Sequence, residues 1–243
     1  MVVPSVAVVT GADRGLGLAL ATGLAEQGWR VFAGRFLPDW PDLDRLAGQY
    51  PGMVSPIPLD VSCLGSSTAA AVAAREKTDH VDLLINNAGA NSPSRTRNIR
   101  DGLDYDEMHR LYDINALGAL RAVEAFLPLM ESSTMKRLCF VSSEAGSISR
   151  ARRDAWHCYC MSKAALNMGV RLLHNHLRPD GYSFRVYHPG WIRSWIGGTG
   201  VQPDEGGQEP EAAAAPALAY FLGNVPDEDE LLMQDGKGQT WPW

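Results

Sequence analysis

The strongest constraint on the fold is an alternation of short apolar runs with longer amphipathic stretches along most of the 243 residues. The expected strands are residues 6–9, 31–33, 54–58, 83–85, 137–141 and 184–187, and the expected helices are 16–27, 42–49, 66–77, 105–130 and 159–177. Right-handed crossovers place such alternating strands side by side in a parallel sheet, with helices on both faces. The sequence therefore predicts an α/β fold with a doubly wound sheet, built by residues 1–243 as a single domain.

Composition excludes several classes of protein. Asp and Glu number 28 against 22 Lys and Arg, and the resulting net charge of −6 disfavours binding to nucleic acid or to acidic membranes. No apolar run reaches the roughly 18 residues of a membrane span, and residues 1–9 lack the features of a signal peptide. The 4 cysteines are too few and too unevenly spaced for a disulfide framework or a metal site. We expect a cytoplasmic protein without a metal.

A glycine-rich turn follows the first expected strand. Residues 10–17 read Thr-Gly-Ala-Asp-Arg-Gly-Leu-Gly, between a strand and a helix. Glycines permit a tight turn and let a pyrophosphate approach the helix N-terminus, where free amides favour anions. The spacing differs from GxGxxG, and no Gly-Lys-Ser/Thr follows, so a P-loop is disfavoured. A tight turn without a ligand also explains this segment when it is considered alone.

An arginine ends the second strand region. A site selective for NAD would place an acidic residue there to bind the ribose 2′-hydroxyl, but this chain has Arg35. A guanidinium can bind the 2′-phosphate of NADP through paired hydrogen bonds, and Arg14 of the glycine turn could approach the same group. The two arginines favour NADP(H), although solvated surface side chains are the alternative.

Tyr159 and Lys163 are four residues apart in an expected helix, which places them on one face. A phenol titrates near 10, and a nearby ammonium group, together with an oxidised nicotinamide, would bring Tyr159 toward neutral pH as an acid/base. An ordinary pair on a helix surface is the alternative.

A further motif, Asn86-Asn87-Ala88-Gly89, lies directly after residues 83–85. Its small and amide side chains suit close approach of a cofactor, although the segment could simply begin a loop.

These motifs together resemble the short-chain dehydrogenases/reductases. In chain order they are the glycine turn, Asp60, residues 86–89, Asn115, the Ser142-Ser143 pair, the Tyr159 to Lys163 segment and His188-Pro189-Gly190. The ending, residues 233–243, looks like the short C-terminus of the C-factor and sniffer-like carbonyl reductase branch. The resemblance covers nearly the whole chain and implies a single-domain Rossmann-type fold.

The resemblance also implies roles for individual residues. Asn115 would shape its helix and hold a water in a proton relay, Ser143 would polarise the substrate carbonyl, and Tyr159 would donate the proton. Lys163 would bind the nicotinamide ribose and lower the pKa of the tyrosine. The NADP(H) site would comprise Gly11, Asp13, Arg14, Gly15, Leu16, Gly17, Arg35, Asp60, Val61, Asn87, Ala88, Gly89, Tyr159, Lys163, Pro189, Gly190, Ile192 and Ser194.

The segment between Ser143 and Tyr159 is longer than usual in the family. Its Arg152 and Arg153 could attract an anionic substrate, as could the arginines of residues 95–100, while solvated loops are the alternative. Trp156 and Trp191 could form aromatic walls for the substrate, although core packing explains them as well.

The leading interpretation is an NADP(H)-dependent oxidoreductase that transfers a hydride between NADPH and a ketone or aldehyde, or the corresponding alcohol. A signalling or regulatory protein that binds NADP on the same fold is the alternative. A methyltransferase would explain the glycine turn but would leave Tyr159 and Lys163 unused. The partners expected are a small carbonyl or alcohol substrate and further copies of the chain, in a homodimer or homotetramer.

Overall fold

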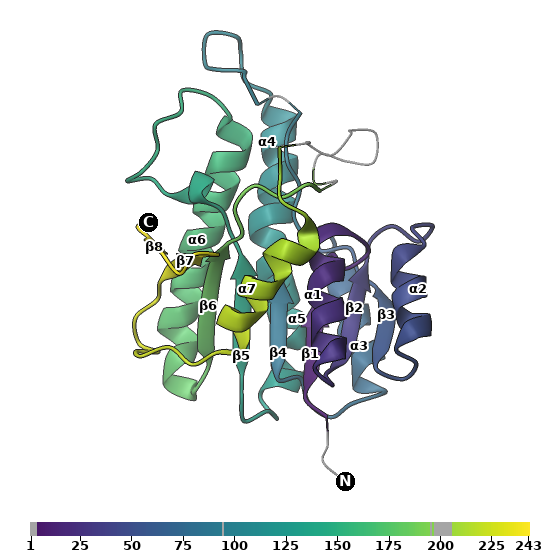
Figure 1. Cartoon of the computed structure of the whole chain (residues 1–243). Helices are drawn as coiled ribbons and strands as arrows, with labels where there is room; N and C mark the ends of the chain where they lie inside the picture. The colour runs from purple at the N-terminus through teal and green to yellow at the C-terminus, as the bar shows by residue number, and fades with distance from the viewer. Residues whose placement is uncertain (1–3, 94, 195, 197–205) are drawn as a thin grey trace.

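The computed structural model describes residues 4–93, 95–194, 196 and 206–243. Within these residues eight strands form one sheet in the order β3-β2-β1-β4-β5-β6-β7-β8 (Figure 1). Neighbouring strands are parallel except β8, which is antiparallel to β7. The strands are β1 (Val6–Val9), β2 (Arg30–Arg35), β3 (Val54–Pro58), β4 (Leu83–Asn86), β5 (Arg137–Val141), β6 (Ser183–His188), β7 (Met233–Asp235) and β8 (Thr240–Trp241). The doubly wound parallel sheet is confirmed.

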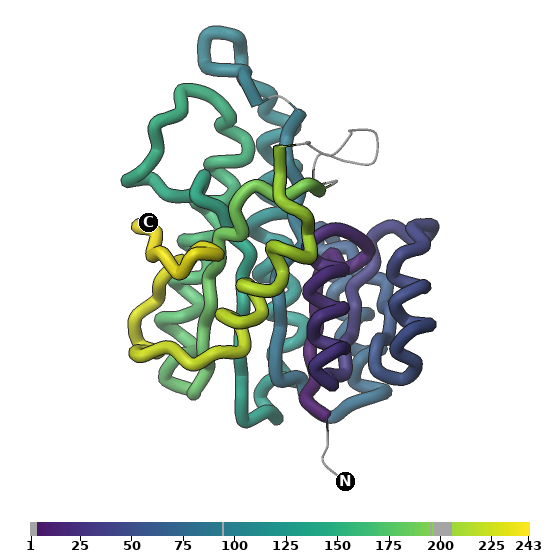
Figure 2. Tube along the Cα trace, viewed as in Figure 1, coloured from purple at the N-terminus to yellow at the C-terminus, as the bar shows by residue number. Residues whose placement is uncertain are grey.

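Helices cover both faces of the sheet. On one face lie α1 (Gly15–Glu26), α2 (Asp42–Gln49) and α7 (Pro210–Leu222), and on the other α3 (Leu64–Arg75), α5 (Gly118–Met130) and α6 (His157–Leu177). In Figures 1 and 2 the first three helices lie toward the viewer. Successive side chains of β1 enter the two cores in turn, since Val6 and Val8 contact one cluster and Ala7 and Val9 the other. This period of two explains why the strand is apolar throughout.

The expected helix over residues 105–130 is interrupted. α4 (Tyr105–Tyr112) runs into a single π-helical turn, η1 (Asp113–Leu117), before α5 begins. A π turn accommodates one extra residue within a continuous helix, so the apolar pattern gives no warning of it. The turn contains Asn115, one of the expected site residues. Short 3₁₀ turns also follow β5 at η2 (Glu144–Gly146) and α6 at η3 (Arg178–Asp180).

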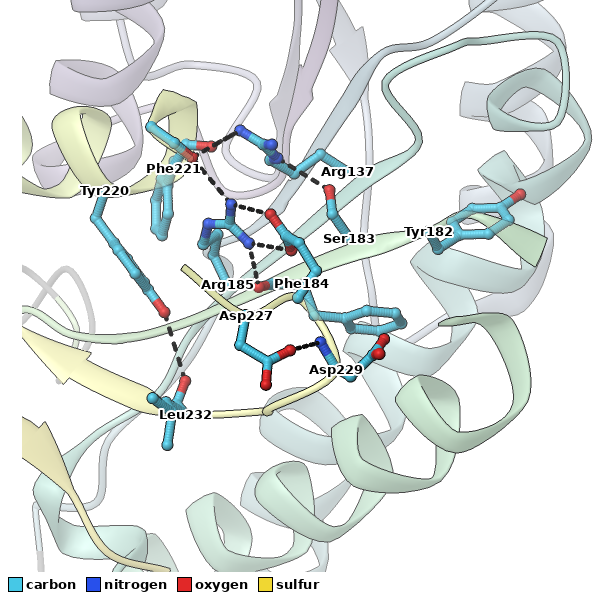
Figure 3. Close-up of polar contacts among 12 residues, drawn as sticks. Arg137, Tyr182, Ser183, Phe184, Arg185, Tyr220, Phe221, Asp227, Asp229 and Leu232 are labelled. Carbon is cyan, nitrogen blue, oxygen red and sulfur yellow. Dashed lines mark hydrogen bonds and ion pairs between the residues drawn. The ribbon is translucent and has the colours of Figure 1, made fainter. Parts of the chain in front are cut away.

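Two buried arginines tie β5 and β6 to the chain after α7 (Figure 3). Arg185, fully buried, donates to both carboxylate oxygens of Glu228 at 2.7 and 2.8 Å and to the Gly223 carbonyl at 2.9 Å. Arg137 donates to the Phe221 carbonyl at 2.9 Å. A buried guanidinium is tolerated only when its charge is paired and its N–H groups are bonded. This network fixes the segment that carries the chain from α7 back to β7.

The strand order reverses between β1 and β4, because the chain proceeds outward from β1 in one direction and from β4 in the other. In open α/β sheets ligands bind beyond the carboxyl ends of the strands at such a reversal. No helix in the described part of the chain is long and apolar enough to cross a bilayer.

Candidate active site

The glycine turn joins β1 to the N-terminus of α1, at the strand-order reversal. A Cβ added at Gly17 would lie only 2.1 Å from the Gly11 carbonyl oxygen and 2.5 Å from the side-chain amide nitrogen of Asn87. Gly11 itself has a φ of +62°, which side chains rarely adopt. Only glycine at these positions lets the turn close against the start of α1, whose first amides, from Gly15 and Leu16 onward, have no side-chain cap from Arg14.

Asn87 braces this turn from β4. Its side-chain amide donates to the carbonyls of Thr10 at 2.9 Å and Gly11 at 3.1 Å. The Thr10 hydroxyl in turn accepts from the backbone amides of Asn87 at 3.0 Å and Ala88 at 2.9 Å. Thr10 was not among the residues that we expected at the site. Its place directly after β1, as the hydroxyl-bearing residue that begins the turn, was the signal in the sequence.

The end of β2 carries the expected pair of arginines. Arg35 forms an ion pair with Asp44 of α2, and the Arg14 guanidinium lies 5.1 Å from the centroid of the Trp40 ring. The buried carboxylate of Asp13 accepts from the backbone amides that follow Arg35 at 3.1 and 3.3 Å, and so couples the glycine turn to β2. The structure therefore places both cations beside the glycine turn. Neither Trp40 nor Asp44 was predicted.

Asp60 and Val61 follow β3 beside these elements. Asp60 accepts from the backbone amide and the hydroxyl of Ser62 at 2.9 and 2.7 Å. Val61 is buried, and a Cβ added at Gly118 would lie 2.8 Å from its Cγ2, so α5 approaches this strand end closely. Both residues border the carboxyl edge of the sheet, as expected of a site at this edge.

Asn115 links the loop after β4 to α6. Its Oδ1 accepts from the Ala90 amide at 2.7 Å, while its Nδ2 donates to the Ala90 carbonyl at 2.9 Å and to the Ser162 hydroxyl at 2.9 Å. The π turn places this side chain between the two segments. Gly89 keeps the adjacent space open, because a Cβ there would lie 3.2 Å from the Oδ1 of Asn115 and 3.7 Å from the Nζ of Lys163.

The two serines after β5 have different partners. The Ser142 hydroxyl donates to Asn167 of α6 at 2.6 Å. The Ser143 side chain accepts from the backbone amide of Ala145 at 3.1 Å, which caps the first 3₁₀ turn, and lies close enough to the Tyr159 phenol to lower the pKa of that group. Of the two, Ser143 is therefore the serine that reaches Tyr159.

Tyr159 lies in the first turn of α6 and is buried. Burial raises the pKa of its phenol to about 12, while the Ser143 hydrogen bond and the charge of Arg95 act in the opposite direction. In this structure burial therefore outweighs the groups that would bring the phenol toward neutral pH. The Trp156 indole stacks on the phenol ring, with centroids 4.7 Å apart and an angle of 18° between the planes.

Lys163 follows one helical turn later. Its Nζ lies 5.8 Å from the centroid of the Tyr159 ring and donates to the Val141 carbonyl at 3.0 Å. Burial lowers the pKa of this ammonium group to about 8. Asn115 of η1, Ser143 before η2, and Tyr159 and Lys163 of α6 thus meet at one place from three separate parts of the chain, beside Gly89 and near the glycine turn.

The chain after β6 returns to the glycine turn. The Pro189 carbonyl accepts from the Gln208 side chain at 2.7 Å, Gly190 has a φ of +79°, and Ile192 forms a β-bridge with Gln208. A Cβ added at Gly15 would lie 3.6 Å from the Cβ of Ser194, so this segment borders the start of α1. Residues 197–207 are rich in glycine and acidic residues, and their sequence predicts a loop at the ligand mouth. They lie largely outside the described residues, as does Trp195.

The longer segment before α6 lies at the mouth of the site. Trp156 adopts a left-handed backbone with φ +66°, and its indole nitrogen donates to the Asn91 side chain at 3.0 Å. Arg153 pairs with Glu144, whereas Arg152 is exposed and donates to the carbonyl of its neighbour Ala151 at 2.8 Å. Trp191 is 45% exposed, which argues against the core-packing explanation for that residue. Asn91 and Glu144 were not predicted.

The family model described as "short chain dehydrogenase" matches residues 5–201. The chain belongs to this family. It is 41% identical over 166 residues to the "C-signal" of Myxococcus xanthus, across 68% of this chain and 95% of the relative. An NADPH-bound carbonyl reductase from chicken fatty liver superposes with a TM-score of 0.84 at 28% identity, over 100% of both chains.

The Drosophila melanogaster carbonyl reductase Sniffer shares the fold of this chain, with a TM-score of 0.82 at 21% identity and 100% coverage of both. The resemblance to this oxidoreductase family and to its C-factor and sniffer-like branch is therefore confirmed.

Proposed function

We propose that this short-chain dehydrogenase is an NADP(H)-dependent oxidoreductase that interconverts a ketone or aldehyde and the corresponding alcohol, with Tyr159 as the general acid/base. The observation that carries the proposal is the convergence of Ser143 and Lys163 on the buried Tyr159, with the Lys163 Nζ 5.8 Å from the centroid of the Tyr159 ring. A phenol, a hydroxyl and an ammonium group that converge in this way can polarise a carbonyl and transfer a proton to its oxygen.

The residues fit NADP(H). A side chain at Gly17 would fill the space that the turn needs, and the N-terminus of α1, which has no side-chain cap from Arg14, suits a pyrophosphate. Arg14 and Arg35 stand where a 2′-phosphate would lie if the adenosine half extends along the end of β2. The chicken relative, which has NADPH bound, supports this assignment. Bound NADPH would supply the hydride.

In the direction of reduction, Ser143 and Tyr159 both donate hydrogen bonds to the substrate oxygen. Tyr159 is protonated at neutral pH because its pKa is about 12. An alkoxide is a far stronger base than a phenolate, so the developing charge on the substrate oxygen takes the phenol proton readily. Lys163 then stabilises the phenolate that forms. Asn115 holds the loop after β4 against α6 and so keeps Lys163 and Tyr159 in position beside that loop.

The test is NADPH oxidation by the purified protein with a panel of ketones and aldehydes, in wild type and Tyr159→Phe. We expect the variant to bind NADPH with unchanged affinity in calorimetry and to lose turnover by a factor on the order of 10² to 10⁴. Full turnover in the variant would refute the role of Tyr159.

A second candidate is a signalling protein with little turnover, which the match to the C-signal favours. The same panel separates the two functions, because such a protein would bind NADPH but reduce none of the compounds.

The four free cysteines agree with the cytoplasmic location that we propose for either function.

A further inference from the structure

A cavity of about 380 Å³ opens next to Trp156, whose indole stacks on the ring of Tyr159. Arg95 and Thr96 line it from the loop after β4, and Arg153, Asp154, Ala155 and Trp156 line it from the segment before α6. In Figure 1 both loops stand above the carboxyl edge of the sheet. A volume of this size accommodates part of a small molecule.

Trp156 connects this cavity to the acid/base. The Arg153 guanidinium lies 5.2 Å and the Arg95 guanidinium 5.6 Å from the centroid of the indole, on which Tyr159 also stacks. The Asn91 hydrogen bond fixes the indole, and the left-handed backbone at Trp156 is a strained conformation of the kind found at ligand sites. Both guanidiniums therefore lie within about 10 Å of the phenol ring.

Charge around the cavity opposes the charge of the whole chain. Residues 95–101 and 144–154 contain 6 arginines and 3 acidic residues, in a protein of net charge −6. One of those acids, Glu144, binds both terminal nitrogens of Arg153 and holds its guanidinium in place. A guanidinium has five N–H donors, so about three remain for a ligand.

We propose that this cavity is a substrate subsite for a carboxylate, which Arg95 and Arg153 bind, while a flat apolar part of the substrate contacts Trp156. This subsite rests on the proposed function. It defines the substrates as carbonyl compounds with a carboxylate about one aromatic ring away from the reacting carbon. Planar guanidiniums bind carboxylates through paired hydrogen bonds. The distance of about 10 Å between the two guanidiniums and the Tyr159 ring limits the length of a substrate that reaches both.

The test compares 4-formylbenzoate with its neutral methyl ester under NADPH oxidation. Arg95→Gln should lower kcat/KM for the carboxylate about tenfold, mainly through KM, and change that for the ester less than about twofold. Arg153→Gln should act in the same direction. Arg100→Gln is the matched control, because it removes an equal charge from the same loop at an exposed residue outside the cavity lining.

Equal losses for both aldehydes, no loss in either cavity variant, or an equal effect of Arg100→Gln would overturn the subsite. Binding of 4-formylbenzoate to the NADP⁺ complex of Tyr159→Phe, measured by calorimetry, tests the subsite without turnover. We expect Arg95→Gln to weaken that binding about tenfold, and an unchanged affinity would also overturn the proposal. A wild type that binds 4-formylbenzoate through Arg95 but reduces neither aldehyde would instead contradict the proposed function alone.

Discussion

The Nζ of Lys163 lies 5.8 Å from the centroid of the Tyr159 ring, and burial shifts the two groups in opposite directions. It raises the pKa of Tyr159 to about 12 and lowers the pKa of Lys163 to about 8. In both cases the neutral form gains, because burial penalises the charged form of any group. The phenol is thus protonated at neutral pH, as an acid that serves reduction requires.

This state of the tyrosine can be tested by titration of the cofactor-free protein. Because its pKa is raised, the Tyr159 phenolate should be absent below pH 10 and form only as the pH nears 12. The measurement is the ultraviolet difference titration of wild type against Tyr159→Phe, which isolates one phenol. An ionisation step for this tyrosine below pH 9 would contradict the view that burial is the main influence on its pKa.

Lys163 should destabilise the cofactor-free fold at neutral pH. Its pKa falls from 10.5 unfolded to about 8 folded, so the unfolded chain binds more protons between these values and stability rises with pH across that window. At pH 7, Lys163→Met should raise the free energy of unfolding by up to about 3 kcal/mol, and by less at pH 10. Denaturant unfolding at both pH values checks this; a loss of stability at pH 7 would show that the bond to Val141 outweighs the burial cost.

Gly17→Ala should abolish NADPH binding, because the added Cβ would lie 2.1 Å from the Gly11 carbonyl oxygen and force the turn open. Gly48→Ala is the matched control. Gly48 lies in α2 with no atom within 4 Å of an added Cβ, so alanine there should raise the free energy of unfolding by about 0.5–1 kcal/mol and leave NADPH affinity unchanged. Calorimetry with NADPH and denaturant unfolding measure the two effects. Wild-type affinity in Gly17→Ala would mean that the turn relaxes without loss of the binding geometry.

The alternation of strands and helices from β1 to β6 was predictable because each of these strands is built around a short apolar run, whereas the helices are longer and amphipathic. β1, β3 and β5 have the predicted bounds. β2 and β6 extend past their predicted ends at polar residues such as Arg35 and His188, which strand patterning alone would not include. β7 and β8 went unpredicted, because strands of three and two residues show no period.

The residues at the site were predictable where a motif carries them, and not where their role depends on a distant partner. Tyr159 and Lys163 are four residues apart, and this spacing in the sequence predicts that they share one face of a helix. Thr10 acts through an amide 77 residues away, and Asn91 through an indole 65 residues away. No local pattern marks such pairs, because only the folded sheet brings them together.

Substitutions at Arg35 and Asp44 should have opposite effects on the affinity for NADPH. Arg35→Gln should weaken NADPH binding about tenfold or more and leave NADH binding nearly unchanged, because only NADPH carries the 2′-phosphate. Asp44→Asn removes the carboxylate that pairs with Arg35 and should strengthen NADPH binding. Arg45→Gln, an exposed charge change on the same helix, serves as the control. Parallel changes in the NADPH and NADH affinities of Arg35→Gln would place this side chain away from the 2′-phosphate.

Glu228 should matter for stability and not for chemistry. Its carboxylate binds the fully buried Arg185 of β6 and none of the proposed catalytic residues, all of which the structure describes. Glu228→Gln leaves a buried charge without its counter-ion and should cost about 3 kcal/mol of unfolding free energy. Asp229→Asn removes the neighbouring but exposed pair with Arg178 and should cost less than about 1 kcal/mol. Partial burial raises the pKa of Glu228, yet Arg185 more than offsets it, and the net pKa is lowered.

The Glu228 contribution is therefore present above the unfolded pKa of 4.5 and disappears as the pH falls through the lower folded value. Denaturant unfolding at pH 7 and in acid should show the gap between wild type and Glu228→Gln narrowing as Glu228 becomes protonated, with kcat of the folded variant unchanged at pH 7. A gap that stays constant into acid would mean that the carboxylate charge is not what stabilises Arg185. The hydrogen bond from Arg185 to the Gly223 carbonyl would then hold the chain after α7 without it.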